Sequence, residues 1–508
     1  MTTSMKSILL AAFSLLSVSA AAEPTGDEIR AAAGRDPHGA LALFAEFLAL
    51  PNDAHYPDDI DRLVAWIEPQ FEKRGFTTRR VATAGSPALF AERRVEGAAK
   101  TALIYLQADG QPVDAAKWDQ ESPWKATMKR PLGDGAYEAI PWPARGAAID
   151  PDWRVFARSA SDSKGPMAQF LLAIDALDAA GIAPGYNLKV IVDTEEELGS
   201  PNLAPAVEAN RALLAADFLL VFDGPPHASN APTVVFGARG ITTLTLTTWG
   251  PKTPQHSGHF GNFLPNPAHD LALLLASLKD ADGRVRIKGF YDGVKIDRAT
   301  REILAATPDD EAAILARMGQ ARTDKVAPSL QEALQYPSLN IRGLDALYVG
   351  DEARTLIPAS ATAELDIRTV VESDPERLAA LVRGHIEKQG FHVLDRPPTD
   401  EERRDHARIA TLTHHVAYAA FRSDFDGAPG LVARAGMKRL YGAEPILIRT
   451  GGGSIPIAPF VSTLAIPAAI VPSVNIDNNQ HAENENIRVG NFLDGVAILA
   501  STLAARAE

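Results

Sequence analysis

The sequence predicts an α/β protein in which a mostly parallel sheet is flanked by helices and a smaller α+β domain is inserted. Two observations indicate this fold. Short apolar segments alternate with segments of helical period in the N-terminal half and again near the C-terminus. Between them, polar and apolar residues alternate with a period of two, which is typical of an antiparallel sheet with one solvated face. With 508 residues the chain is about three times the usual size of one domain, so it can contain both parts.

The first α/β segment opens with apolar residues at helical spacing over residues 41–75. Three short apolar runs are then expected to form buried strands: residues 101–106, 188–192 and 218–222. An amphipathic helix is expected over residues 164–180. It is expected to end there because Gly181 follows and favours the left-handed conformation of a helix C-cap. Strands separated by helices in this order predict a parallel sheet covered on both faces.

Residues 238–424 are expected to form the inserted domain. Polar and apolar residues alternate at 243–247 and again at 362–368, which predicts antiparallel strands. Two helical segments are expected between these strands: residues 266–278 and 298–318. After residue 424 the α/β pattern returns, with a helix, a strand and a final helix expected at residues 431–441, 465–471 and 489–505. The α/β domain is therefore expected to consist of residues 23–237 and 425–508.

The first 22 residues have the features of a secretory signal peptide. Lys6 supplies a positive charge, residues 8–18 are apolar but too short to span a bilayer, and Ala20–Ala22 offers a small-residue cleavage site. The alternative is an apolar amphipathic helix that stays on the protein. We expect removal of residues 1–22 and export to the periplasm.

The composition excludes several functions. Lys and Arg number 50 against 64 Asp and Glu, a net charge of −14, so nucleic acid is not expected as a partner. The chain has no cysteine, so disulfides, thiolate metal sites and a Cys nucleophile are excluded. No later apolar run is long enough for a membrane helix, so no membrane association is expected after signal cleavage.

Polar residues follow the expected strands at their carboxyl ends, where ligands bind in open α/β sheets. These residues are Gln107, Asp109, Glu196, Glu197 and Asp223. Asp162 precedes the helix over residues 164–180, and His481 lies in a polar loop near the C-terminus. Each residue alone is more often a helix cap, a turn residue or a solvated charge. Several acidic loops at one sheet edge repel one another unless a cation lies among them, so together they predict a metal site.

Taken in order, these segments resemble the M20 family of metallopeptidases over nearly the whole mature chain, from Phe44–Pro51 to the final helix. The resemblance implies a zinc-peptidase-like catalytic domain that holds two divalent metal ions. Zinc is the metal that it favours, with manganese or cobalt as alternatives. It also implies a smaller lid domain through which two copies can form a homodimer.

The resemblance implies a metal-binding role for five residues. Asp162 matches the carboxylate that bridges the two ions, Glu197 and His481 match the other ligands of one ion, and Asp223 matches a ligand of the second. The family has His-x-Asp where this chain has Gln107 followed by Ala and Asp. A glutamine offers only a neutral amide oxygen, which is a weaker zinc ligand than imidazole. The first site is therefore expected to bind a harder ion, to bind its ion loosely, or to be lost.

The resemblance also implies catalytic and substrate-binding residues. Glu196 matches the general base, Asp109 the acid that orients the first metal ligand, and His256 a lid histidine that stabilises the oxyanion. The substrate carboxylate is expected to contact Arg368 and the loop Gly452, Gly453 and Ser454.

These assignments predict an exopeptidase that hydrolyses dipeptides or short peptides with a free C-terminal carboxylate. One alternative is an N-acyl amino acid deacylase of the same family. The other is a descendant that binds peptides without cleaving them, which only Gln107 supports. Retention of Glu196 argues against the second alternative, since a binding protein has no use for a general base.

Overall fold

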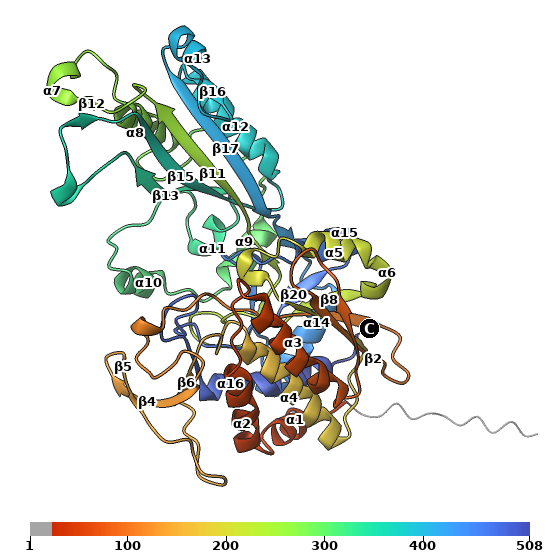
Figure 1. Ribbon diagram of the computed structural model, residues 1–508. Helices are drawn as coiled ribbons and strands as arrows, with labels where there is room; N and C mark the ends of the chain where they lie inside the picture. Colours follow the sequence, from red (N-terminus) through yellow and green to blue (C-terminus); the bar gives the residue numbers. More distant parts are fainter. Residues whose placement is uncertain (1–22, 508) are drawn as a thin grey trace, which may run out of the picture.

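The structure is a computed structural model that describes residues 23–507. It consists of a larger and a smaller part, and the chain passes from the larger to the smaller and back again (Figure 1). The expected signal peptide lies outside the described residues, so its removal stays a prediction. Within residues 23–507, every helix is too short or too polar to cross a bilayer.

The larger part is built around an eight-stranded sheet with the order β1-β2-β7-β3-β8-β20-β9-β19. Its strands are β1 (Thr77–Val81), β2 (Ala88–Arg93), β3 (Thr101–Gln107), β7 (Asn187–Asp193), β8 (Phe218–Val221), β9 (Thr233–Val235), β19 (Ile446–Ile448) and β20 (Ala468–Ile470). The central strands β7, β3, β8 and β20 are parallel, as the alternation of strands and helices predicts. Strands β1 and β2 at one edge, and the pair β20 and β9, are antiparallel, so the sheet is mixed.

Helices cover both faces of this sheet. One face carries α1 (Gly26–Ala33), α2 (Pro37–Leu48), α3 (Pro57–Glu72), α4 (Lys164–Ala180), α14 (Ala428–Tyr441) and α16 (Val489–Leu503). The other face carries α5 (Leu203–Ala209), α6 (Arg211–Leu214) and α15 (Ala458–Leu464). Adjacent β3 residues point to opposite faces, so Ile104 packs in the first core and Tyr105 in the second. This explains why the strand is apolar along almost its whole length.

Prolines divide two segments that were expected to be continuously helical. Helices α2 and α3 are separate because Pro51 interrupts the first run and Pro57 begins the next helix. The expected helix over residues 298–318 likewise forms α9 (Arg298–Ala305) and α10 (Glu311–Arg317), with Pro308 between them. Helix α4 ends as expected at Gly181, whose φ of 67° is left-handed.

The smaller part has its own five-stranded sheet, with the order β13-β15-β11-β17-β16. Its strands are β11 (Gly240–Trp249), β13 (Ser338–Asp345), β15 (Ser360–Thr369), β16 (His392–Leu394) and β17 (Ile409–Tyr418). All pairs are antiparallel except β16 with β17, and alternate residues of β15 are buried, as the period of two predicts. Helices α8 (Pro267–Leu278) and α12 (Pro375–Lys388) pack against its buried face. The α/β class with a separate smaller sheet domain is thus confirmed, while the limits 238–424 stay a prediction.

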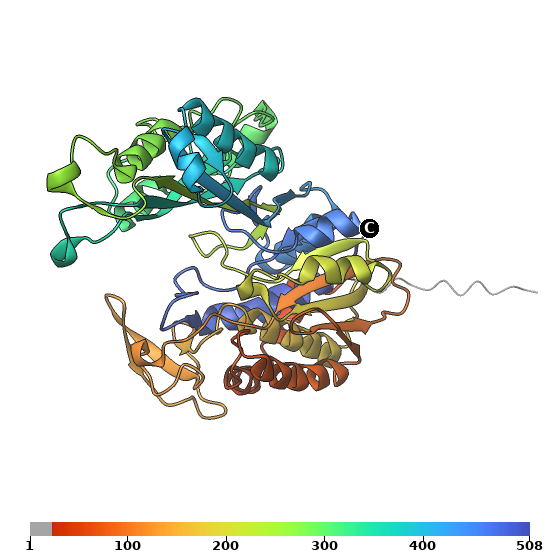
Figure 2. The same cartoon turned by 45° about the horizontal axis from the view of Figure 1, so that its top comes forward.

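Short elements complete the two parts. A four-stranded sheet in the larger part contains β4 (Thr127–Gly133), β5 (Ala136–Ala139), β6 (Arg154–Phe156) and β21 (Asn486–Arg488). The smaller part also contains α7 (Ser257–Phe260), α11 (Leu330–Ala333), α13 (Asp400–Asp405), β12 (Gln255–His256) and β14 (Leu356–Ile357). Figure 2 shows the smaller part standing over the larger one as a separate layer.

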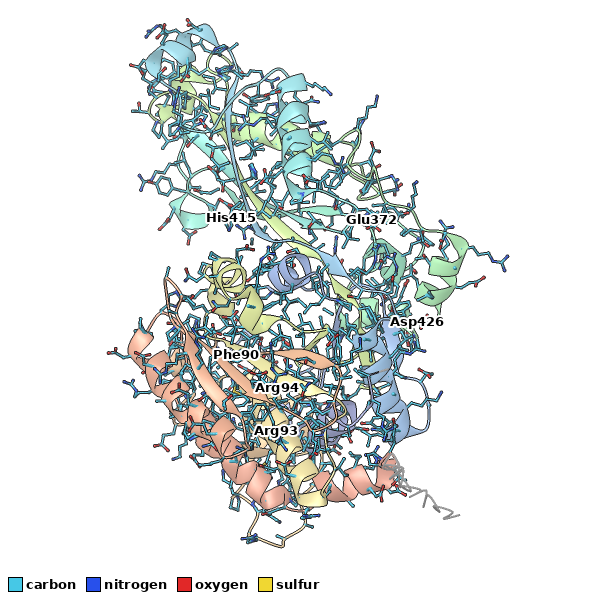
Figure 3. All side chains as sticks on the ribbon, turned by 90° about the vertical axis from the view of Figure 1, so that its right-hand side faces the viewer. Phe90, Arg93, Arg94, Glu372, His415 and Asp426 are labelled. Carbon is cyan, nitrogen blue, oxygen red and sulfur yellow. The ribbon has the colours of Figure 1, made fainter. Side chains whose placement is uncertain are left out.

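The two parts are joined where the chain crosses between them. Strands β10 (Gly237–Ala238) and β18 (Phe421–Arg422) pair there as a two-stranded ladder. Arg422 forms an ion pair with Glu372, with 2.7 Å between Nη2 and Oε1. Figure 3 labels Glu372 and His415 at the edge of the smaller part that faces the larger one.

Candidate active site

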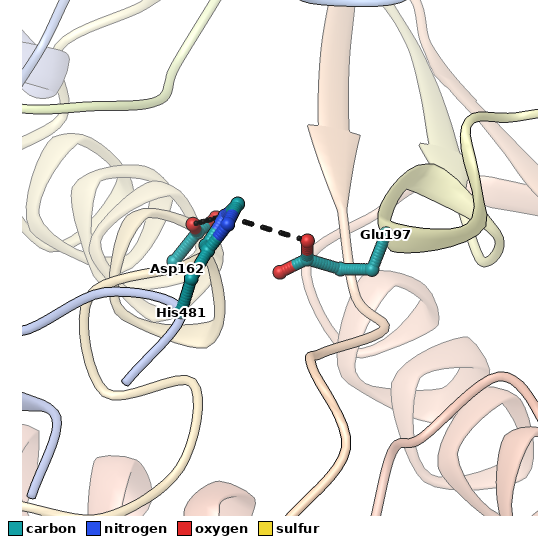
Figure 4. A group of neighbouring side chains, drawn as sticks. All are labelled: Asp162, Glu197 and His481. Carbon is teal, nitrogen blue, oxygen red and sulfur yellow. Dashed lines mark ion pairs between the residues drawn. The ribbon is translucent and has the colours of Figure 1, made fainter. Parts of the chain in front are cut away.

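Three of the predicted metal ligands lie together: Asp162, Glu197 and His481 (Figure 4). The Nε2 atom of His481 is 3.0 Å from Asp162 Oδ2 and 3.4 Å from Glu197 Oε2. One potential ligand atom from each residue lies within 4.8 Å of the other two. Two carboxylates and an imidazole at this spacing are a donor set that suits zinc and related divalent ions.

The order of the strands explains why residues distant in the sequence meet. Strands β7, β3 and β8 are neighbours and parallel, so their carboxyl ends lie at one edge of the sheet. Glu196 and Glu197 lie in a 3-10 turn after β7, Asp109 follows β3, and Asp223 follows β8. The backbone N–H of Glu197 donates to Asp109 Oδ2 over 2.9 Å, so the Asp109 carboxylate holds this turn in place.

The carboxyl groups at this edge are electrostatically unfavourable when all are charged. Burial and the neighbouring Asp162 raise the pKa of Glu197 to about 8 and that of Asp223 to about 7. The same two causes hold the pKa of Glu196 well above its usual range. A hydrogen bond to Asp162 raises the pKa of His481 to about 9. A divalent cation would relieve this repulsion, so the donor set fits at least one such ion.

Gln107 lies on the other side of Asp162. Its Nε2 atom donates to Asp162 Oδ1 over 3.0 Å and to Ser163 Oγ over 2.8 Å. The hydroxyl of Ser163 lies 2.6 Å from Asp223 Oδ1. The family resemblance implies that Gln107 would share a metal ion with these carboxylates. In the structure its amide nitrogen, and not its oxygen, faces them.

Glu485 is a residue of this site that the sequence patterns did not identify. Its side chain is 1% exposed and forms an ion pair with Arg158, with 2.8 Å between Oε2 and Nη1. Its other oxygen accepts hydrogen bonds from the backbone N–H groups of Ser161 and Asp162, each over 2.9 Å. The buried carboxylate therefore fixes the turn that carries Asp162. The one sequence feature that could have pointed to Glu485 is its position four residues after His481, in the same polar run.

Tyr418 is a second residue that sequence reasoning missed, and it comes from the smaller part. Burial and the nearby carboxylates of Glu196 and Asp193 raise its pKa. A Cβ atom added to Gly199 would lie 3.4 Å from the Tyr418 hydroxyl. The end of β17 thus reaches the acidic turn after β7, and no sequence pattern indicated this contact.

The structure places His256 away from this group of residues. His256 ends β12, which lies with α7 at the far end of the smaller part (Figure 1). Its Nδ1 atom accepts a hydrogen bond from Gly258 N over 3.0 Å, and its ring centroid is 4.5 Å from that of His259. Within one chain, His256 therefore does not face the acidic edge.

Arg368 and Ser454 meet at the junction of the two parts. Arg368 Nη1 donates to Ser454 Oγ over 2.9 Å, next to Gly452 and Gly453. Burial and the adjacent Arg368 lower the pKa of Arg239 to about 10. Two neighbouring guanidinium groups can bind a carboxylate with paired hydrogen bonds.

Comparison with known proteins agrees with this fold. The chain is 28% identical to the Cys-Gly metallodipeptidase DUG1 of Saccharomyces cerevisiae over 420 residues, 80% of this chain and 79% of the relative. It is 25% identical to the Beta-Ala-His dipeptidase of Homo sapiens over 358 residues, 69% of this chain and 68% of the relative.

Solved structures extend the similarity to almost the whole chain. The M20 family metallo-carboxypeptidase Sso-CP2 from Sulfolobus solfataricus superposes with a TM-score of 0.75 at 28% identity, covering 92% of this chain and 98% of that one. Human carnosine dipeptidase 1 has the same fold, with a TM-score of 0.73 at 21% identity over 95% of this chain and 99% of that one. The family model described as peptidase family M20/M25/M40 matches residues 134–505. The predicted resemblance is confirmed, and the chain belongs to the M20 family of metallopeptidases.

Proposed function

We propose that this protein is a metal-dependent exopeptidase that cleaves dipeptides or short peptides bearing a free C-terminal carboxylate. The observation that carries this proposal is the convergence of Asp162, Glu197 and His481 beside Glu196 at the carboxyl edge of the sheet. Relatives named as metallodipeptidases and a metallo-carboxypeptidase support a peptide substrate. An N-acyl amino acid deacylase would use the same residues, and the assay below separates the two reactions.

A divalent ion held by Asp162, Glu197 and His481 would polarise the scissile carbonyl and lower the pKa of a water molecule. Zinc is our first choice, with manganese and cobalt as alternatives. Glu196 is the proposed general base, because a carboxylate with a raised pKa can accept a proton from water and return it to the leaving amine. Asp109 positions the turn that carries both glutamates.

Arg368 and the Gly452, Gly453 and Ser454 loop are proposed to bind the substrate's terminal carboxylate. The guanidinium of Arg368 is 31% exposed and is oriented by Ser454 Oγ, so it can receive an anion. Binding at this point would restrict cleavage to the end of a peptide, as expected for an exopeptidase.

We also propose a homodimer in which His256 serves the partner's site. His256 is exposed, and large apolar side chains near it are exposed too, with Phe260 at 38% and Phe263 at 80%. Such side chains favour contact with a second copy. In the partner's site, an imidazole N–H can stabilise the oxyanion, a contribution worth about 10²–10³ in rate.

Subunit complementation tests the dimer. Chains with His256→Ala and chains with Glu196→Gln should each be nearly inactive, whereas mixed and re-equilibrated chains should recover about a quarter of wild-type activity. This follows because each mixed dimer has one site with both residues intact. Failure to recover activity, in chains shown to exchange by light scattering and mass labelling, would refute the shared site.

Hydrolysis assays test the function itself. The protein starting at Glu23 should release amino acids from a dipeptide panel with zinc, manganese or cobalt and should stop with a chelator. Preferential cleavage of N-acyl amino acids would favour the deacylase. No cleavage with any metal, by folded protein that still binds peptide, would refute the enzyme proposal. Export to the periplasm is proposed from residues 1–22 alone, and cell fractionation with mass analysis of the mature N-terminus tests it.

A further inference from the structure

The two oxygens of Asp162 face different environments. Oδ2 faces His481 Nε2 at 3.0 Å, within the group that also contains Glu197. Oδ1 faces Gln107 Nε2 at 3.0 Å and Ser163 Oγ at 2.9 Å. The Oδ2 side therefore meets potential metal ligands and one distant amide donor, Gln480 Nε2 at 3.4 Å, while Oδ1 accepts a closer hydrogen bond from Gln107.

The donors on the second side form a closed network. The amide of Gln107 has two N–H groups, one for Asp162 Oδ1 and one for Ser163 Oγ. Ser163 Oγ lies near both carboxylates, and its single hydroxyl hydrogen is assigned to the nearer oxygen, Asp223 Oδ1 at 2.6 Å, because Gln107 already donates to Asp162 Oδ1. Two hydrogens thus bind the two carboxylates between which a second metal ion would lie, and a third joins Gln107 to Ser163. Hydrogen bonds to carboxylates are strong because they are charge-assisted.

The orientation of the Gln107 amide decides whether a cation can bind at this position. The side chain is 3% exposed, and its Oε1 atom has no hydrogen-bond partner among the described residues. Turning the amide would place this oxygen about 3.0 Å from Asp162 Oδ1, where two acceptors repel unless a cation separates them. A neutral amide oxygen is a weak replacement for imidazole, so the network of donors is the more favourable arrangement.

We propose that this chain binds one divalent ion, at Asp162, Glu197 and His481, and that the Gln107–Ser163 network replaces the second ion of the family's site. The inference rests on the proposed metal centre but not on its activity. Asp162 would then be a ligand of one ion and a hydrogen-bond acceptor, and would not bridge two ions.

Metal stoichiometry tests this inference directly. Chelator-treated protein is dialysed to equilibrium against buffered free Zn²⁺, and bound zinc is measured by atomic emission. We expect one ion per wild-type chain and two per Gln107→His chain, because the imidazole removes the amide donors and adds a nitrogen ligand. Should Gln107→His fail to fold, the nearly isosteric Gln107→Glu supplies a carboxylate ligand for the same measurement.

Gln320→His is the matched control, because residue 320 is exposed in the smaller part. This variant should bind one ion, like the wild type, which excludes a general effect of adding a histidine. Electron paramagnetic resonance with Mn²⁺ gives an independent readout. Wild-type protein should show the spectrum of an isolated ion, and Gln107→His that of two coupled ions.

Two zinc ions per wild-type chain, or coupled Mn²⁺ in the wild type, would overturn the inference. One ion in both wild type and Gln107→His would also overturn it, since Gln107 would then not be what excludes the second ion. Activity is measured separately, so the two proposals can fail independently. A wild type with two ions that hydrolyses dipeptides refutes only the inference, and one with a single ion that hydrolyses nothing refutes only the proposed function.

Discussion

Glu485→Gln should destabilise the larger part strongly, although the two side chains have the same shape. In the wild type, Oε2 accepts hydrogen bonds from Arg158 Nη1 and Ser159 N, each over 2.8 Å. Oε1 accepts from Ser161 N, Ser161 Oγ and Asp162 N, over 2.9–3.0 Å. The amide of glutamine must point its NH₂ group at one of these two sets. At least two buried donors then lose their acceptor.

The loss of stability can be estimated from the orientation that breaks fewer hydrogen bonds, in which the glutamine NH₂ group faces Arg158. The Arg158 side chain is 3% exposed, so its charge would be left in the protein interior without its carboxylate. Breaking a buried ion pair by removing one partner costs about 3–5 kcal/mol. We therefore expect the free energy of unfolding to fall by that amount, and metal affinity to fall as well, because the turn carrying Asp162 is loosened.

Equilibrium urea denaturation, followed by tryptophan fluorescence, measures this change. Among the six tryptophans only Trp249 lies within residues 238–424, so the signal reports chiefly on the larger part. Glu208→Gln is the matched control: Glu208 pairs with Arg211 over 2.7 Å, but the side chains are 60% and 56% exposed. That change should cost about 0–1 kcal/mol. An equally small loss for Glu485→Gln would refute the reasoning.

Three further predictions concern pH, substrate binding and helix ends. In the folded protein the pKa of Glu197 is raised to about 8 and that of His481 to about 9, so the folded state holds these protons more tightly than the unfolded state. The metal-free protein should therefore lose stability as pH rises from about 5 to 9. Melting temperatures that rise or stay level over this range would contradict the prediction. Bound metal should reduce that loss. Arg368→Lys should raise the KM for dipeptides about tenfold with a smaller change in kcat, since lysine cannot form paired hydrogen bonds; equal losses in kcat and kcat/KM would assign it another role. Gly181→Ala should lower stability by about 1 kcal/mol, because alanine is strained at the Gly181 φ of 67°. In the same thermal melts Gly384→Ala should raise stability by about 0.5–1 kcal/mol, because this glycine lies inside α12 and an added Cβ meets no atom within 4 Å.

The sequence predicted the centre of the fold better than its edges. Strand β3 is apolar on both faces because helices cover both, and that continuous pattern identified it. Strand β1 has four of its five residues exposed or half-buried, so no apolar run indicated it. The small sheet that includes β4 and β21 joins residues more than 300 positions apart through β6, a pairing that no local pattern specifies.

The types of residue that the site contains could be recognised from the sequence alone, because metal and base chemistry need carboxylates and imidazole. It also indicated the sheet edge, since Asp109, Glu197 and Asp223 each follow an apolar strand. The way these groups face one another depends on the folded chain, because their hydrogen-bond partners come from distant segments. Asp162 and His481 are 319 positions apart (481 − 162), yet their side chains lie 3.0 Å apart. The same long-range packing turns the amide nitrogen of Gln107 toward Asp162.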